Sequence, residues 1–294
     1  MNYLEKYAYS PDEAKISRAL ELISQNLSHV SSPEVLKKCF SMMDLPTMRT
    51  QDTEQSVKAL VDKVCLLGKT YPEYPLPASV CVYPNFAHVV AAHRPSPELH
   101  VTTVSGCFPS SQSFLEVKVR ECELAVRDGA DEIDIVLALN AFEAGDYDAA
   151  FAEIAAMKKA IDAAAVGRKV TLKVILETGL LKTPEKIAIA SFVAMEAGTD
   201  FIKTSTGKVE VNATPMAAYV MCEAIKAFHK KSGRKVGFKA AGGISNAQDA
   251  LCYYSIVSGI LGPDWLDKSL FRFGVSRLGN SLMSAVEQST VTFF

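Results

Sequence analysis

The amino-acid sequence predicts a single (β/α)₈ barrel, of the TIM-barrel type, preceded by an N-terminal helical extension. Eight short apolar or β-branched segments alternate with amphipathic segments, which is the pattern of a parallel sheet with helices between its strands. The count of eight favours a closed barrel over an open doubly wound sheet. No linker or low-complexity segment divides the 294 residues, and this length suits one large α/β barrel.

The first 40 residues are expected to be helical. Ser10-Pro11-Asp12-Glu13 places a hydroxyl cap, a proline at the first helical position and a glutamate three residues after the cap. Ser32-Pro33-Glu34 begins a second helix in a similar way. We therefore expect residues 1–40 to form a helical extension that packs on a barrel of residues 41–294.

The strands are expected where short runs are rich in apolar and β-branched residues. In chain order these runs are Ser41–Leu45, Ala78–Tyr83, His100–Val104, Glu132–Leu137, Val170–Leu176, Asp200–Thr204, Val236–Ala240 and Ser269–Gly274. The alternative fold is an open nucleotide-binding sheet. Its Gly-x-Gly-x-x-Gly fingerprint is absent after the first strand, and so is the Walker A pattern.

Amphipathic segments between these runs predict helices, several of which open with a capping residue. The predicted helices include Ser113–Asp128, Ala149–Ala164, Pro184–Ala197, Pro215–Lys231 and Asn246–Gly259. The predicted caps are Ser113 with Glu116, Thr183 before Pro184, Thr214 before Pro215, and Ser245 with Gln248.

Composition excludes several classes of function. With 31 Lys+Arg against 33 Asp+Glu and a pI of about 6.2, the chain lacks the basic surplus of a general nucleic-acid binder. Its seven cysteines form no CxxC pair or metal-ligand spacing, so we expect reduced thiols in the cytoplasm and no metal site. No apolar run approaches the ~18 residues of a membrane span. Nucleic-acid and membrane partners are therefore not expected.

Four predicted strands carry a charged residue where a barrel strand should be apolar: Asp134, Lys173, Lys203 and Lys239. Asp44 and Glu177 lie at the ends of two further strands. Because barrel strands are covered on both faces, each of these charges needs a partner, a ligand or a place at the barrel mouth. Structural ion pairs filling the lumen are the alternative explanation for any single pair.

Two of these lysines indicate a specific chemistry. Lys203 and Lys239 lie near the C-terminal ends of consecutive predicted strands, which is the end where barrel enzymes place their sites. Two ammonium groups held close together repel, so one can lose its proton near neutral pH. A neutral amine in a covered pocket attacks carbonyl groups, which predicts Schiff-base catalysis.

The segments that follow the last three strands have the small residues of a phosphate site. Thr204-Ser205-Thr206-Gly207-Lys208 supplies hydroxyls, a flexible backbone and a cation, and Gly242-Gly243 follows the strand of Lys239. Phe273-Gly274-Val275-Ser276 follows the last strand. Many barrels hold a phosphate in the loops after strands seven and eight, so a phosphate site is expected here.

At these residues the sequence resembles the deoxyribose-phosphate aldolases, class I aldolases that fold as (β/α)₈ barrels. The resemblance runs from about Ser41 to about Leu278 and implies reversible cleavage of 2-deoxy-D-ribose 5-phosphate to acetaldehyde and D-glyceraldehyde 3-phosphate, without a metal or other cofactor, in deoxyribose phosphate catabolism. Four ordered motifs carry it: Gly129-Ala-Asp-Glu-Ile-Asp134, Leu172-Lys-Val-Ile-Leu-Glu-Thr-Gly179, Asp200-Phe-Ile-Lys-Thr-Ser-Thr-Gly-Lys208 with Val211-Asn-Ala-Thr-Pro215, and Gly237-Phe-Lys-Ala-Ala-Gly-Gly243.

The resemblance implies catalytic roles for three residues and supporting roles for two. Lys203 matches the Schiff-base lysine and Lys239 the neighbouring cation that lowers its pKa. Asp134 matches the carboxylate that moves protons through a water. Lys173 and Asp44 match residues around that proton network.

The resemblance also implies a substrate phosphate site. The matching residues are Gly207, Lys208, Gly242, Gly243, Gly274 and Ser276. Cys81 matches a position near the substrate channel, where we expect a buried small thiol.

The chain departs from the family pattern at three places. Arg277 follows Ser276 where a second serine is usual, and Ala240 replaces a proline after Lys239. The well-studied bacterial members end in a tail with a terminal tyrosine, whereas this chain has no tyrosine after Tyr254. Proton exchange at the enamine is then expected to depend on water and Asp134.

Two other functions stay open. The first is a weakly active or inactive barrel that serves as a binding or scaffolding protein through its N-terminal extension or a basic cluster. That cluster comprises Lys226, His229, Lys230, Lys231, Arg234 and Lys235. The second is a Schiff-base aldolase for a different sugar phosphate. The family usually forms monomers or dimers, and we expect a homodimer.

Overall fold

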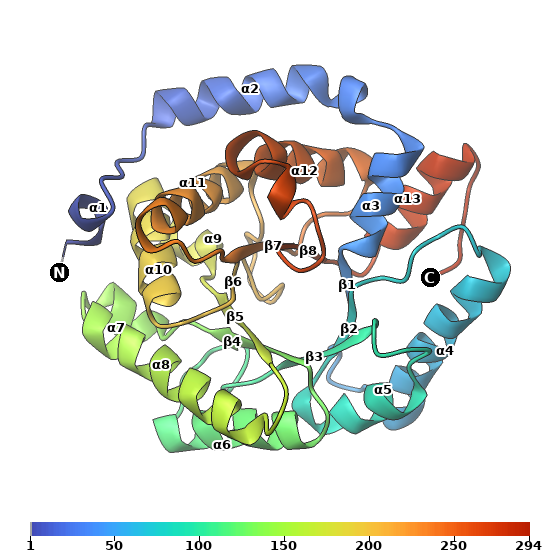
Figure 1. Cartoon of the computed structure of the whole chain (residues 1–294), viewed down its shortest axis with the longest axis horizontal. Helices are drawn as coiled ribbons and strands as arrows, with labels where there is room; N and C mark the ends of the chain where they lie inside the picture. Colours follow the sequence, from blue (N-terminus) through green and yellow to red (C-terminus); the bar gives the residue numbers. More distant parts are fainter. Residues whose placement is uncertain (1) are drawn as a thin grey trace.

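The computed structural model describes residues 2–294 and contains a closed barrel of eight parallel strands in the order β1 to β8 (Figure 1). The prediction of a (β/α)₈ barrel is therefore confirmed. The strands are β1 (Met43–Pro46), β2 (Ser79–Val82), β3 (His100–Val104), β4 (Glu132–Val136), β5 (Thr171–Ile175), β6 (Phe201–Lys203), β7 (Gly237–Ala241) and β8 (Phe271–Gly274). All eight overlap the runs expected from the sequence.

Helices surround the barrel and follow the strands in turn (Figure 1). They are α4 (Glu54–Thr70), α5 (Ala87–His93), α6 (Leu115–Arg127), α7 (Leu139–Glu143), α8 (Tyr147–Ala164), α9 (Thr178–Leu181), α10 (Pro184–Glu196), α11 (Pro215–Ser232), α12 (Ala247–Leu261) and α13 (Leu278–Glu287). None of the helices in residues 2–294 is long and apolar enough to cross a membrane.

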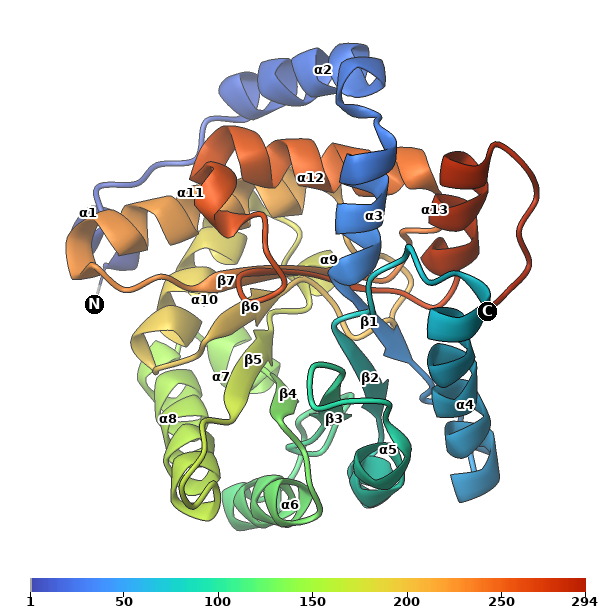
Figure 2. The ribbon, with the colours of Figure 1, turned by 45° about the vertical axis from the view of Figure 1, so that its right-hand side comes forward.

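The N-terminal segment forms three helices, α1 (Tyr3–Lys6), α2 (Glu13–Val30) and α3 (Pro33–Ser41). The helix α2 lies outside the ring, across α11 and α12 (Figures 1 and 2). The third helix, α3, packs on α12 and α13 and leads directly into β1. The division of the chain at residue 41 stays a prediction.

Tyr7, just after α1, attaches the start of the chain to the barrel. Its ring stacks on Phe192 of α10 at a centroid distance of 4.2 Å, and its hydroxyl donates to Glu196 at 2.8 Å. These contacts hold α1 against α10, so both ends of the N-terminal segment are packed on the helical ring.

Some of the predicted helix N-caps are present in the structure and others are not. The side chains of Ser32, Thr183 and Thr214 each accept a backbone N–H at the start of their helices, as predicted. Ser10, Ser113 and Ser245 do not cap. Asp12 caps α2, Phe114 occupies the cap position of α6 without a side-chain bond, and Asn246 forms a capping box with Asp249.

Two of the three wrong caps share a cause. At α2 and α12, the residue that caps lies one or two positions after the predicted serine and has an equally good acceptor. The helices α4, α5 and α13 were not predicted from the sequence. The start of α4 does carry a capping box, formed by Thr53 and Ser56.

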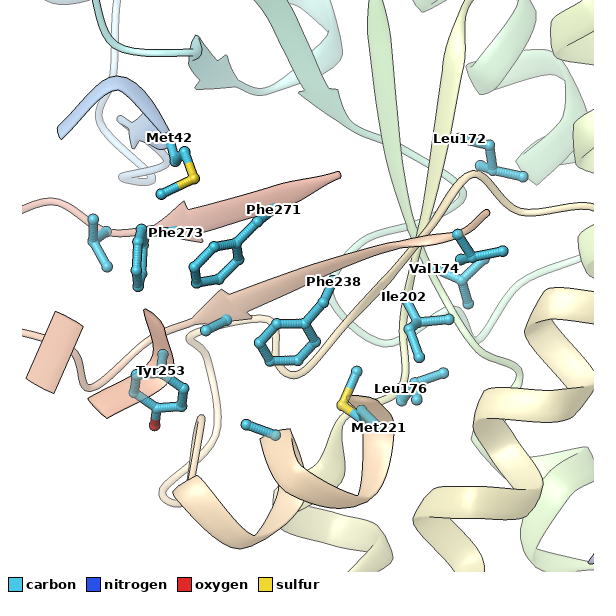
Figure 3. Close-up of a cluster of buried hydrophobic side chains, with 14 of the residues drawn as sticks. Met42, Leu172, Val174, Leu176, Ile202, Met221, Phe238, Tyr253, Phe271 and Phe273 are labelled. Atoms are coloured by element: carbon cyan, nitrogen blue, oxygen red, sulfur yellow. The ribbon is translucent and has the colours of Figure 1, made fainter. Parts of the chain in front are cut away.

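Side chains alternate between the two faces of the strands, and the outer face forms the apolar core. Figure 3 shows Phe238 of β7 and Phe271 and Phe273 of β8 beside Met221 of α11 and Tyr253 of α12. The rings of Phe271 and Phe273 lie 4.6 Å apart. Full burial of one such side chain contributes about 1.5–3 kcal/mol, so this layer holds the helices on the strands.

We predict that Asn246→Ala destabilises the protein by about 1 kcal/mol, because the start of α12 loses its capping box. Ser245→Ala is the matched control and should change the free energy of unfolding by less than about 0.5 kcal/mol. Equilibrium urea denaturation measures both variants. A larger loss for Ser245→Ala than for Asn246→Ala would contradict the assignment of the cap.

Candidate active site

The inner face of the strands carries a group of buried charges. Because strand side chains alternate with a period of two, the residues that flank apolar outward positions point into the lumen. Arg272 lies between the outward Phe271 and Phe273 in this way. Lys203 pairs in register with Lys239 on the neighbouring strand, so the two lysines lie side by side.

Asp134, on β4, lies at the centre of the charged side chains in the barrel lumen. Its Oδ2 lies 2.8 Å from the Nζ of Lys203 and 2.9 Å from the Nζ of Lys239. Its Oδ1 accepts a hydrogen bond from Lys173 at 2.8 Å. The amines of Lys203 and Lys239 thus contact one oxygen, which brings them close together as their sequence positions predicted.

Arg272 on β8 links two further carboxylates. Its Nη1 lies 2.6 Å from Asp44 Oδ1 and its Nη2 lies 2.7 Å from Glu132 Oε1. The other oxygen of Asp44 lies 2.5 Å from Lys239 Nζ. Asp44 therefore connects the arginine to the lysine pair.

Glu132 on β4 has several donors of its own. Lys173 Nζ lies 2.5 Å from its Oε2, and the hydroxyl of Thr102 donates to the same oxygen at 2.9 Å. The half-exposed imidazole of His100 contacts Oε1 through Nδ1 at 2.7 Å. The buried network thus extends from His100, at the start of β3, to Lys203, at the end of β6.

This network contains one more cation than it has carboxylates. Its carboxylates number three and its cations number four, so full ionisation would leave one excess positive charge among buried groups. The carboxylates are Asp44, Glu132 and Asp134, and the cations are Lys173, Lys203, Lys239 and Arg272. The network is neutral when one lysine gives up its proton.

Of the two neighbouring lysines, Lys203 is the one whose pKa is lowered. Burial lowers the pKa of Lys203, and the Lys239 charge lowers it further, against the opposing effect of Asp134. Burial also acts on Lys239, but the charges of Asp134 and Asp44 together raise the pKa of Lys239 above its usual value. Lys203 has one carboxylate beside it and Lys239 has two, which explains why the two pKa values move in opposite directions.

The carboxylates stay ionised. Burial opposes ionisation of Asp134, but Lys173, Lys203 and Lys239 together hold its pKa well below the usual range. The same balance, with Arg272 and Lys173 as the main cations, keeps the pKa of Glu132 low. Asp134 is therefore a weak base that accepts hydrogen bonds throughout.

A cavity of about 940 Å³ opens above Lys203 and Lys239. All six residues of the predicted phosphate site line it, and so does Asp44. Those six are Gly207, Lys208, Gly242, Gly243, Gly274 and Ser276. Cys81 also lines the cavity, and burial raises the pKa of its thiol to about 11, so it stays protonated.

Two predicted site residues lie beneath the cavity instead of lining it. Both are fully buried: Asp134 contacts the cavity-lining Lys203 and Lys239, and Lys173 contacts Asp134 beneath them. Glu177 is buried as well, and its carboxylate hydrogen-bonds to Thr206; the charge of Lys203 acts on it, although no ion pair joins the two within residues 2–294.

Sequence reasoning missed Arg272 and Glu132. Both were inside predicted strands, and Arg272 breaks an apolar run between two phenylalanines just as the lysines do. Arg49 and Lys63, which line the outer part of the cavity, were also missed. No pattern in the sequence marks these two, because they come from a loop and a helix that follow β1.

Residues 40–252 match the family model for the DeoC/LacD family aldolases. The chain belongs to this family. A Caenorhabditis elegans protein provisionally named deoxyribose-phosphate aldolase is 42% identical over 269 residues, which cover 91% of this chain and 86% of the relative.

Solved structures agree on the fold. An aldolase named QR15 is 28% identical, with a TM-score of 0.66 over 85% of this chain and 95% of its own. The deoxyribose phosphate aldolase of Aeropyrum pernix, described as tetrameric, is 23% identical, with a TM-score of 0.68 over 93% of this chain and 98% of its own. The protein is thus an aldolase, a lyase, on a (β/α)₈ barrel.

We predict that Lys239→Leu raises the pKa of Lys203, because it removes a like charge and leaves Asp134 with fewer cations. Reductive trapping of acetaldehyde on the protein, measured across pH, should need a higher pH to reach half its maximum. Lys186→Leu, which removes an exposed lysine paired with Glu143, is the control. An unchanged midpoint in Lys239→Leu would contradict the coupling.

Proposed function

We propose that the protein reversibly cleaves 2-deoxy-D-ribose 5-phosphate to acetaldehyde and D-glyceraldehyde 3-phosphate, with Lys203 as the Schiff-base residue. One observation carries the proposal: a buried lysine with a lowered pKa lines a cavity whose rim offers glycine loops and basic side chains. The name of the relative that is 42% identical supports the choice of substrate.

The first chemical step needs a neutral amine. Lys203 Nζ adds to the C1 aldehyde of the open-chain sugar, and the carbinolamine loses water to give an iminium ion. The iminium carries a permanent positive charge, so the network again holds four cations against three carboxylates. Asp134, 2.8 Å from Lys203 Nζ, is placed to stabilise that charge.

The second step breaks the C2–C3 bond. The C3 hydroxyl loses its proton and becomes the aldehyde of glyceraldehyde 3-phosphate, while the bonding electrons move into the iminium and form a neutral enamine. Protonation at C2 and hydrolysis then release acetaldehyde and the free amine. We assign Asp134 to orient a water for these proton transfers, with Lys173 and Lys239 keeping it ionised and Asp44 holding Lys239.

We assign the phosphate to the loops after β6, β7 and β8. Gly207, Gly242 and Gly243 have positive φ angles of 79°, 76° and 78°, which glycine adopts without strain and which bring the backbone close to a ligand. Lys208 and Arg277 add positive charge at the same rim. An anionic substrate is attracted by such a group of charges.

The scaffolding alternative loses part of its basis. Three members of the basic cluster are used within the fold: Arg234 donates to carbonyl groups of Met195 and Thr199, Lys231 donates to Lys6, and Lys235 pairs with Asp264. Ion pairs that served only the fold would not require a lysine with a lowered pKa. Cleavage of a different sugar phosphate by the same Schiff base remains the closer alternative, and a substrate comparison separates the two.

A cytoplasmic location and a homodimer stay predictions. The tetramer described for the Aeropyrum pernix enzyme belongs to that protein. Analytical ultracentrifugation of this chain would give its own assembly state.

We predict that Lys203→Leu abolishes both cleavage of deoxyribose 5-phosphate and the borohydride-trapped adduct with acetaldehyde, because Lys203 lines the cavity with a lowered pKa while that of its neighbour Lys239 is raised. Mass spectrometry of the trapped wild-type protein should place the adduct on Lys203. Lys203→Arg keeps a basic side chain of similar length and should be equally inactive, since a guanidinium does not form the imine.

Two results would contradict this assignment. One is an adduct at another lysine in Lys203→Leu. The other is wild-type protein that traps acetaldehyde but does not cleave deoxyribose 5-phosphate, which would refute the substrate while keeping the chemistry.

We predict that Lys208→Met raises the KM for deoxyribose 5-phosphate about tenfold, because a charge-assisted contact to the phosphate is lost. Activity with unphosphorylated 2-deoxyribose should stay within about twofold of wild type, since that substrate never makes the contact. Equal losses with both substrates would show that Lys208 acts on the fold of its loop and not on the phosphate.

A further inference from the structure

Glu177 is a buried carboxylate that the aldolase mechanism leaves unused. It follows β5, and its side chain is 2% exposed. The hydrogen bonds of its carboxylate within residues 2–294 go to Thr206, three residues after Lys203: Oε1 accepts the Thr206 N–H at 3.2 Å and Oε2 accepts the hydroxyl at 2.5 Å. Glu177 thus reaches from the end of β5 to the loop after β6.

Thr206 in turn contacts Lys208, two residues further along the same loop. Thr206 Oγ1 accepts the backbone N–H of Lys208 at 3.0 Å while its own proton is donated to Glu177. Gly207, held between these two residues, adopts a φ of 79°. The backbone N–H of Thr178 also donates to Thr204 at 2.9 Å, so the two chain segments are joined at two points.

Holding Glu177 in this position costs free energy. Its backbone is left-handed, with φ 56° and ψ 57°, a conformation that is strained for a residue with a side chain. Burial raises the pKa of its carboxyl, and the bonds to Thr206 and the charge of Lys203 only partly oppose this effect. An apolar residue would avoid the cost of burying the carboxylate, so a purely structural role explains Glu177 poorly.

We propose that Glu177 is a positioning residue that, through Thr206, fixes the loop of residues 204–208 in the conformation that receives the substrate phosphate. The inference rests on the proposed function for the identity of the substrate. Because Glu177 acts on the loop and not on Lys203, its loss should weaken binding of the phosphorylated substrate and leave imine formation intact.

The test compares Glu177→Leu with wild type in three measurements. The KM for deoxyribose 5-phosphate should rise about tenfold, since two hydrogen bonds to a charged group are lost. The rate of borohydride trapping with acetaldehyde, which carries no phosphate, should stay within about twofold of wild type. Hydrogen exchange of a peptide containing residues 204–208 should become faster.

Three further variants sharpen the test. Glu177→Gln keeps an acceptor for the Thr206 N–H and should recover most of the wild-type KM. Adding Thr206→Val to Glu177→Leu should raise the KM by less than the product of the two single effects, because both changes remove the bond between the Thr206 hydroxyl and Glu177, while Thr206→Val also removes the acceptor of the Lys208 N–H. Glu143→Gln, which changes an exposed carboxylate on α7, is the control and should behave as wild type.

Three outcomes overturn the proposal: an unchanged KM with unchanged exchange in Glu177→Leu, trapping that falls as far as KM rises, or additive effects in the double variant. If Glu177→Leu fails to fold, a wild-type KM and wild-type exchange in both Glu177→Gln and Thr206→Val also overturn it. Wild type that does not cleave deoxyribose 5-phosphate refutes the proposed function alone, since the exchange measurements still decide the role of Glu177.

Discussion

The excess of one positive charge in the barrel lumen is the constraint on which the site depends. Four cations and three carboxylates are buried together in the lumen, and loss of one lysine proton removes the excess. Lys203 has one carboxylate neighbour and Lys239 has two, so Lys203 is the lysine of this pair that loses its proton more readily. Nucleophilicity at the barrel mouth is thus a consequence of charge balance across the whole lumen.

The same arrangement explains how the barrel tolerates buried charge. Strands β5 to β8 send apolar side chains outward to the helices (Figure 3) and Lys173, Lys203, Lys239 and Arg272 inward, so the apolar layer and the charge network share the same backbone. Each carboxylate contacts at least two cations, and Glu132 also accepts from Thr102. Removing one partner would leave the others uncompensated, which couples the fold to the site.

Sequence patterns predicted the fold, and the structure brings the predicted catalytic residues together. Apolar runs located the strands because burial on both faces leaves a continuous signal. Lys203, Lys239 and Asp134 are charged residues within those apolar runs, so the sequence identified them as candidate site residues. Arg272 and Glu132 also interrupt the apolar pattern of their strands. The excess of positive charge, however, follows only from the contacts among these residues in the structure. The role of Glu177 depends on a contact with Thr206, 29 positions away, which no local pattern encodes.

The charge balance can be measured directly by NMR titration of protein labelled with ¹³C at the lysine Cε atoms, with Lys203 assigned by its substitution. The account predicts that the Cε resonance of Lys203 titrates below the ordinary lysine pKa, while that of Lys239 remains in its protonated position across the same range. A Lys203 resonance that titrates at or above the ordinary value, or one that follows Lys239, would contradict it.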